Sequence, residues 1–266
     1  MPVEDSVVRA RGRGASVAWT GWGRAEHTVA AGTLVHAAVA GRPNAPEVVC
    51  VHGLGCSHRY FGPFARALAP AARVVAPDLP GFGRTTGPRE ALDVRGLSLA
   101  LAAWVRTTRR AGAAFVANSL GCQVVVDMAA HSPELVGPVV LTGPTMDPHA
   151  RTAARQAARL AANVPFERPS LGVVLARDYL ACGPRRFAAT FVHALADPVE
   201  RKLPLVRVPA VVARGARDPI VPRAWATEAA GLLPSGALVE VPGTGHVVNY
   251  SAPDELAAVT RDLLGR

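Results

Sequence analysis

Short apolar runs of strand length recur along the chain, and most of them end at a segment rich in Gly or Pro. From residue 47 onward these runs alternate with stretches whose apolar residues recur at helical spacing. Such alternation predicts a mostly parallel sheet covered by helices on both faces. The predicted parallel strands are 47–51, 73–76, 115–117, 139–141, 210–213 and 238–241. Ahead of them, β-rich segments at 6–19 and 33–40 predict an antiparallel edge.

The rhythm of strands is interrupted between residues 145 and 203. Apolar residues at helical spacing predict three amphipathic helices there, at 149–162, 171–180 and 185–195, joined by Pro and Gly. The chain is therefore divided into a first core part (1–144), a helical insertion (145–203) and a second core part (204–266). The spacing alone leaves open whether these helices cover a site or pack as an outer layer.

Length and composition fit a single α/β domain that carries an insertion. The chain has 266 residues, of which 50% are hydrophobic, enough to bury a sheet on both faces. The net charge of +9 rests on scattered arginines, with Lys202 as the one lysine. Because nucleic-acid binding needs a clustered basic patch, we expect no nucleic-acid partner.

The N-terminal sequence and the spacing of the cysteines favour a cytoplasmic protein. The first thirty residues do not have the pattern of a signal peptide, and the apolar runs are too short to span a bilayer, so we expect no stable membrane insertion. The four cysteines, Cys50, Cys56, Cys122 and Cys182, show no metal-type spacing and fit a reduced compartment.

The strongest chemical signal is Ser119, which interrupts an apolar run between two small residues, Ala117 and Gly121. A serine on a tight turn from strand to helix presents its hydroxyl as a nucleophile, and such a turn needs small neighbours. Glycine is usual two residues before this serine, so Ala117 is a departure that requires a negative φ. The simpler alternative is that Ser119 caps a helix.

Other polar residues follow predicted strands. The run 47–51 ends at His52-Gly53-Leu54-Gly55, a glycine-rich strand end that can present a backbone amide to an oxyanion. Asp218 follows the run 210–213, and His246 follows the run 238–241. For Asp218, an ordinary role in the turn before Pro219 is the alternative.

Taken jointly, these motifs resemble the α/β-hydrolase superfamily over nearly the whole chain. The resemblance rests on His52-Gly53, Asp78-Leu79-Pro80-Gly81-Phe82-Gly83, Asn118-Ser119-Leu120-Gly121, Gly215-Ala216-Arg217-Asp218 and Gly245-His246. Ser119, Asp218 and His246 stand in that family's order of nucleophile, acid and base. The resemblance implies an α/β-hydrolase fold in which residues 145–203 form a helical cap over the active site.

Roles for individual residues follow from the resemblance. Ser119 is the expected nucleophile, His246 the base and Asp218 the acid, with Asp147 as the fallback acid. The amides of Leu54 and Leu120 are the expected oxyanion donors. The expected substrate-binding residues are Gly53, Asn118, Tyr179 and Val247. His52 and Asp78 are expected to be structural.

The implied activity is that of a serine hydrolase acting on an ester or thioester of a small apolar acyl substrate, with no cofactor and no metal. A serine at position 119 argues against dehalogenation and epoxide hydrolysis, which use aspartate there in the resembling families. Asn118-Ser119 resembles the hydrolases that cleave carbon–carbon bonds, but Val247 stands where those have tryptophan. A biosynthetic cyclase or isomerase, a small-molecule receptor and a homodimer remain open alternatives.

Overall fold

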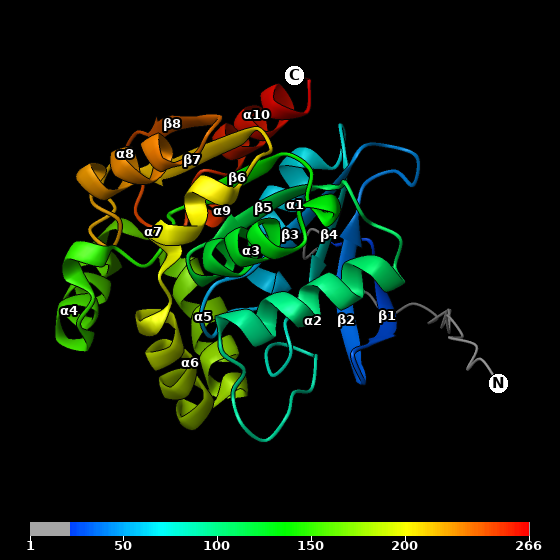
Figure 1. Ribbon diagram of the computed structural model, residues 1–266, viewed down its shortest axis with the longest axis horizontal. Helices are drawn as coiled ribbons and strands as arrows, with labels where there is room; N and C mark the ends of the chain where they lie inside the picture. Colours follow the sequence, from blue (N-terminus) through cyan, green and yellow to red (C-terminus); the bar gives the residue numbers. More distant parts are fainter. Residues whose placement is uncertain (1–21, 266) are drawn as a thin grey trace.

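A twisted sheet of eight strands forms the centre of the protein (Figure 1), whose computed structural model describes residues 22–265. The strand order is β1-β2-β4-β3-β5-β6-β7-β8, and all pairs from β4 to β8 are parallel. The predicted mostly parallel sheet is thus confirmed. The strands are β1 (Arg24–Ala30), β2 (Thr33–Ala40), β3 (Glu47–Val51), β4 (Arg73–Pro77), β5 (Ala114–Asn118), β6 (Val139–Thr142), β7 (Ala210–Gly215) and β8 (Gly236–Val241).

The antiparallel edge is a hairpin of β1 and β2, and β2 also pairs antiparallel with β4. The two hairpin residues, Ala31 and Gly32, have φ angles of 47° and 73°, as a two-residue turn of the primed type requires. The predicted strand at 33–40 is confirmed. Strand β1 was not predicted, and the segment 6–19 lies outside the described residues.

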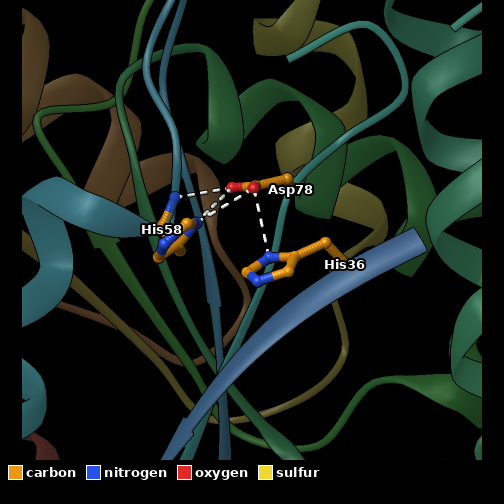
Figure 2. Close-up of side chains that lie close together, drawn as sticks. All are labelled: His36, His58 and Asp78. Atoms are coloured by element: carbon orange, nitrogen blue, oxygen red, sulfur yellow. Dashed lines mark hydrogen bonds and ion pairs between the residues drawn. The ribbon is translucent and has the colours of Figure 1, made fainter. Parts of the chain in front are cut away.

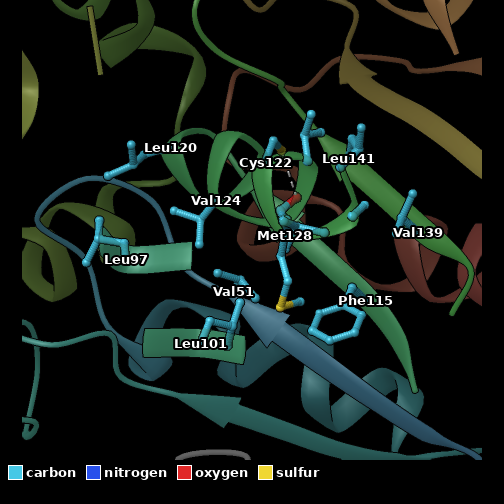
Figure 3. Packing of buried hydrophobic residues seen from close by; sticks show 14 of the residues in the cluster. Val51, Leu97, Leu101, Phe115, Leu120, Cys122, Val124, Met128, Val139 and Leu141 are labelled. Carbon is cyan, nitrogen blue, oxygen red and sulfur yellow. Dashed lines mark hydrogen bonds between the residues drawn. The ribbon is translucent and has the colours of Figure 1, made fainter. Parts of the chain in front are cut away.

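Alternate residues of each strand enter two separate hydrophobic cores. Val49, Val51, Phe115 and Ala117 face one core, whereas Val48, Cys50, Ala114 and Val116 face the other. The first core contains side chains of α2 (Val94–Thr107), α3 (Leu120–His131) and α8 (Arg223–Leu232), and Figure 3 shows part of it. The second contains side chains of α1 (Gly62–Leu68), α9 (Val248–Ser251) and α10 (Pro253–Leu264). Burial on both faces explains why the parallel strands are almost wholly apolar.

The three helices predicted in the insertion are present with shifted ends. They are α4 (Ala153–Asn163), α5 (Pro169–Cys182) and α6 (Pro184–Ala196), and α7 (Val199–Lys202) follows. Helices α5 and α6 begin with proline, which fits the first helical position because its missing N–H needs no partner there. Both lie side by side below the sheet in Figure 1.

A buried carboxylate fastens α5 to the core. Asp178 is 1% exposed, and it accepts hydrogen bonds of 2.7 Å from Ser57 Oγ and from Arg59 Nη1. Arg59 belongs to the short 3₁₀ helix η1 (His58–Phe61), which follows β3. The insertion is therefore held directly against the segment that carries Leu54. No helix within residues 22–265 combines the length and hydrophobicity needed to cross a membrane.

Candidate active site

Ser119 occupies a strained turn between β5 and α3. Its φ is 57° and its ψ is −124°, a conformation that a non-glycine residue adopts only when its surroundings enforce it. Its hydroxyl makes no capping hydrogen bond to α3, so the helix-cap alternative does not apply. Ala117 is not among the described residues with positive φ, which is the condition under which alanine can stand at this position.

A close approach between α3 and β3 explains why the turn needs Gly121. A Cβ on Gly121 would lie 2.3 Å from the Val51 carbonyl oxygen. The approach brings the start of α3 to the end of β3, where Gly53 lies. A Cβ on Gly53 would in turn lie 3.1 Å from Ser119 Cβ. The glycine-rich strand end and the serine are therefore direct neighbours.

Asn118 and Tyr60 form a buried hydrogen-bond network beneath the serine. The Tyr60 hydroxyl accepts from Gly53 N at 2.6 Å and donates to Asn118 Oδ1 at 3.1 Å. Asn118 Nδ2 donates to the carbonyl oxygens of Thr142, at 3.1 Å, and His246, at 3.3 Å. Both ends of the Asn118 carboxamide are thus engaged by the protein. This residue, predicted to bind substrate, joins the turn at Ser119 to the loop of His246.

His246 and Asp218 form a buried pair. His246 Nδ1 lies 2.8 Å from Asp218 Oδ2, and the two residues are 5% and 2% exposed. Asp218 Oδ1 accepts from the amides of Ile220, at 2.7 Å, and Val221, at 3.1 Å. The buried guanidinium of Arg214 donates to the Asp218 carbonyl at 3.1 Å and so fixes this loop from β7.

Gly143 at the end of β6 places the imidazole at the same edge as Ser119. A Cβ on Gly143 would lie 2.8 Å from His246 Cε1 and Nδ1, so the ring packs directly on this glycine. Thr142, the residue before Gly143, accepts a hydrogen bond of 3.0 Å from Ser119 N through its carbonyl oxygen. His246 Nε2 is buried and has no hydrogen-bond partner among residues 22–265, Ser119 included. Such bonds often tighten only when substrate is bound.

Two residues of the insertion hold the backbone around His246. Asn163, at the end of α4, accepts from His246 N through Oδ1 at 3.0 Å. Glu167 accepts from Val247 N at 2.8 Å and from Ser251 Oγ at 2.7 Å. Asn163 Nδ2 donates to Glu167 at 3.0 Å and links the two. Neither residue was predicted, because a polar side chain that bonds to a backbone some eighty residues away has no local sequence pattern.

The charges around His246 favour its protonated form. Burial by itself lowers the pKa of His246, but the carboxylates of Asp218 and Glu167 outweigh that effect and raise the pKa above 6.5. An imidazole stabilised as a cation and hydrogen-bonded at Nδ1 is suited to accept a proton at Nε2.

The predicted oxyanion segment lies against aromatic residues of the insertion. Leu54 precedes Gly55, where a Cβ would lie 2.7 Å from the ring of Tyr179 and 2.8 Å from that of Phe187. These two rings pack edge to face with centroids 5.1 Å apart. Leu120, whose amide is the second predicted donor, is the first residue of α3. Val247 is 7% exposed, and its backbone is bound by Glu167.

Other candidates from the sequence lie in different surroundings. Asp147, the fallback acid, accepts from His149 N at 2.9 Å and from Arg159 Nη1 at 2.7 Å, whereas Asp218 contacts the imidazole of His246. His52 Nε2 accepts from Leu79 N at 3.0 Å, a structural role. Burial raises the pKa of the Cys56 thiol and of the Cys122 thiol well above the usual range for cysteine. Neither residue is therefore a reactive thiolate.

The known proteins to which this chain is similar are hydrolases. A family model described as "Alpha/beta hydrolase family" matches residues 48–259. The chain is similar to RutD of Rhizobium rhizogenes, named as a carbamate hydrolase candidate, with 28% identity over 80% of this chain and 90% of that protein. It is 26% identical to a 2-(acetamidomethylene)succinate hydrolase of Mesorhizobium japonicum, over 81% of this chain and 87% of that protein. The crystal structure of an enol-lactonase from Burkholderia xenovorans superposes with a TM-score of 0.75 at 23% identity, covering 90% of this chain and 100% of that one.

Proposed function

Because the chain belongs to the alpha/beta hydrolase family, we propose that it is a serine hydrolase that cleaves an ester or thioester of a small apolar acyl group. The reaction runs through an acyl-enzyme on Ser119. The observation that carries the proposal is the strained turn that exposes the Ser119 hydroxyl at the edge of the sheet where the His246–Asp218 pair also lies.

Each residue has one task in this reaction. Ser119 Oγ attacks the acyl carbonyl while its proton passes to His246 Nε2, and His246 then gives the proton to the leaving group. Asp218 holds the imidazole through Nδ1 and stabilises its cationic form. Water, activated by His246 in the same way, then releases the acid from Ser119.

The negative charge on the attacked carbonyl oxygen needs backbone donors. We assign this task to the amides of Leu54 and Leu120, which belong to the two segments that meet at Ser119. Losing one such donor typically raises the barrier by about 3 kcal/mol. The aromatic pair of Tyr179 and Phe187, packed against the Leu54 segment, supports an apolar acyl group as the substrate.

A second candidate is hydrolysis of an acyl C–N bond, and it is favoured by a different observation. Two of the three similar proteins named above are a candidate carbamate hydrolase and a 2-(acetamidomethylene)succinate hydrolase. The same serine, histidine and backbone donors serve esters and amides alike. A panel of p-nitrophenyl esters and p-nitroanilides of equal acyl length separates the two candidates by kcat/KM.

Replacement of Ser119 tests the proposal. Alanine keeps the small size that the turn requires and removes the nucleophile, so Ser119→Ala should abolish ester turnover and covalent labelling by a fluorophosphonate. The melting temperature should stay close to that of the wild type, which separates loss of chemistry from loss of fold. Undiminished turnover in this variant would disprove the assignment of the nucleophile.

A further inference from the structure

A second cluster of polar side chains lies buried away from Ser119, on the side of the antiparallel edge. It consists of His36 in β2, His58 in η1 and Asp78 after β4 (Figure 2). The three residues are 2%, 6% and 0% exposed. Nδ1 of His58 lies 2.9 Å from both oxygens of Asp78, and Nδ1 of His36 lies 3.3 Å from Oδ2. One donor atom from each residue lies within 4.8 Å of the other two.

His36 is the unusual member of this cluster. Neither of its ring nitrogens has a hydrogen-bond partner within the described part of the chain, although the ring is almost wholly buried. Nδ1 points toward Asp78, as Figure 2 shows, but without the geometry of a hydrogen bond. Burying a polar group without a partner is costly, so such a group calls for an explanation. A cation bound at Nδ1 would supply a partner for that nitrogen.

Asp78 is suited to be an anionic ligand. Both of its oxygens face imidazole nitrogens, since His58 Nδ1 lies 2.9 Å from each oxygen and His36 Nδ1 lies 3.3 Å from Oδ2. The amides of His58, at 2.7 Å, and Arg84, at 2.9 Å, each donate to one of its oxygens and orient the carboxylate. Each carboxylate oxygen has two lone pairs, of which one accepts from a backbone amide and the other faces the imidazole of His58, where an ion would bind.

We propose that His36, His58 and Asp78 bind one divalent transition-metal ion of the zinc type. Two imidazole nitrogens and a carboxylate are donors that such ions accept, whereas calcium and magnesium prefer oxygen ligands alone. With metal–ligand bonds of about 2.0–2.2 Å, ligand atoms of a tetrahedral site lie about 3.3–3.6 Å apart. The distances of 2.9 Å and 3.3 Å to Asp78 therefore need little adjustment. An imidazole that binds the ion through Nδ1 must carry its proton on Nε2.

The position of the cluster indicates a structural role for the ion. Asp78 begins the loop 78–83, whose Leu79 amide donates to His52 Nε2 at 3.0 Å. The ring of Phe82 in the same loop packs on His52 with centroids 5.4 Å apart. His52 directly precedes Gly53, the neighbour of Ser119. The ion would therefore brace the loop that supports the predicted oxyanion segment without contacting the substrate.

Metal binding by the full chain, purified without a histidine tag and treated with a chelator, tests this proposal. After zinc is added back and the excess is removed, we expect one zinc ion per chain by elemental analysis. The melting temperature should rise by about 5–10 °C at free zinc about 100-fold above Kd, since an ion that binds only the folded state stabilises it by mass action. His36→Gln and His58→Gln should each lose both effects. His27→Gln is the matched control, because His27 is exposed and its ring lies 5.1 Å from that of His36.

Three results would overturn the proposal. They are substoichiometric zinc with an unchanged melting temperature, full zinc binding by both glutamine variants, and loss of binding in His27→Gln alone. If the glutamine variants do not fold, X-ray absorption of the zinc-loaded wild type decides. Nitrogen and oxygen ligands at about 2.0–2.2 Å support the site, whereas sulfur at about 2.3 Å would assign the ion to a cysteine and refute it.

Discussion

From the hydrogen bond between His246 N and Asn163, we predict that the insertion contributes to both stability and kcat. Asn163 is 5% exposed, and its Oδ1 is the acceptor for the buried amide of His246. Asn163→Ala removes this acceptor in a place that water does not reach. Leaving a buried donor unsatisfied costs about 1–3 kcal/mol. Alanine improves helix propensity at the end of α4 by only a few tenths of a kcal/mol, so the variant should be less stable than the wild type.

The same loss should appear in the kinetics if the bond positions the base. The amide of His246 is one bond away from the Cα that carries the imidazole, so a shift of the backbone moves Nε2 relative to Ser119. If the full 1–3 kcal/mol is lost in the transition state, kcat/KM falls by about 5- to 150-fold. The fall should be in kcat rather than KM, because Asn163 bonds to the backbone of the base and to Glu167.

The assay compares kcat, KM and the free energy of unfolding for the wild type, Asn163→Ala and Val164→Ala. Val164 is the next residue along the chain, is 70% exposed and has an apolar side chain, so its truncation should change none of these three quantities appreciably. An Asn163→Ala variant that loses 1–3 kcal/mol of stability but keeps kcat within twofold of the wild type would refute the positioning role. The hydrogen bond would then serve the fold alone.

Two further predictions concern the histidine and its acid. Asp218→Asn should lower kcat by on the order of 10⁴-fold, because it favours the wrong tautomer of His246. Asp147→Asn should leave kcat nearly unchanged, because Asp147 pairs with Arg159. Equal losses of kcat in both variants would contradict the assignment of the acid. Because the base must be neutral and its pKa is raised, kcat/KM should fall with decreasing pH through an acid limb above pH 6.5. Glu167→Gln removes one of the charges that raise this pKa, so the limb should move to lower pH, and an unmoved limb in the pH profile would show that Glu167 does not act on His246 through its charge.

The parts of the fold that were predicted correctly are those in which local pattern and burial agree. The strands from β3 to β7 are mostly apolar because both faces are buried, and the helices of the insertion repeat apolar residues at helical spacing. Strand β1 was missed for the opposite reason. It lies at the exposed edge of the sheet, and its sequence, RAEHTVA, has polar residues on both faces and therefore no apolar face. Its pairing with β2 is decided by the hairpin at Ala31-Gly32.

In the candidate site, too, the features with a local sequence pattern were predicted, whereas those that depend on distant contacts were not. Ser119, Asp218 and His246 each follow a strand, so their residue types and order indicated a common edge before any coordinates were considered. The hydrogen bonds of Asn118 to Thr142 and His246, residues on other strand ends, were not predicted. Nothing within the neighbourhood of residue 118 in the sequence contains this information. Contacts between distant polar residues require the fold itself.

The contacts that hold the three predicted catalytic residues limit how the insertion can vary. Ser119 and Asp218 are fixed by the ends of β5 and β7, within the sheet. His246 follows the edge strand β8 and depends in addition on Asn163 and Glu167, which lie in the insertion. A change of substrate made by exchanging the whole insertion would therefore also remove the supports of the base. A change confined to Tyr179 and Phe187 would leave those supports in place, since neither ring takes part in the bonds to residues 246 and 247.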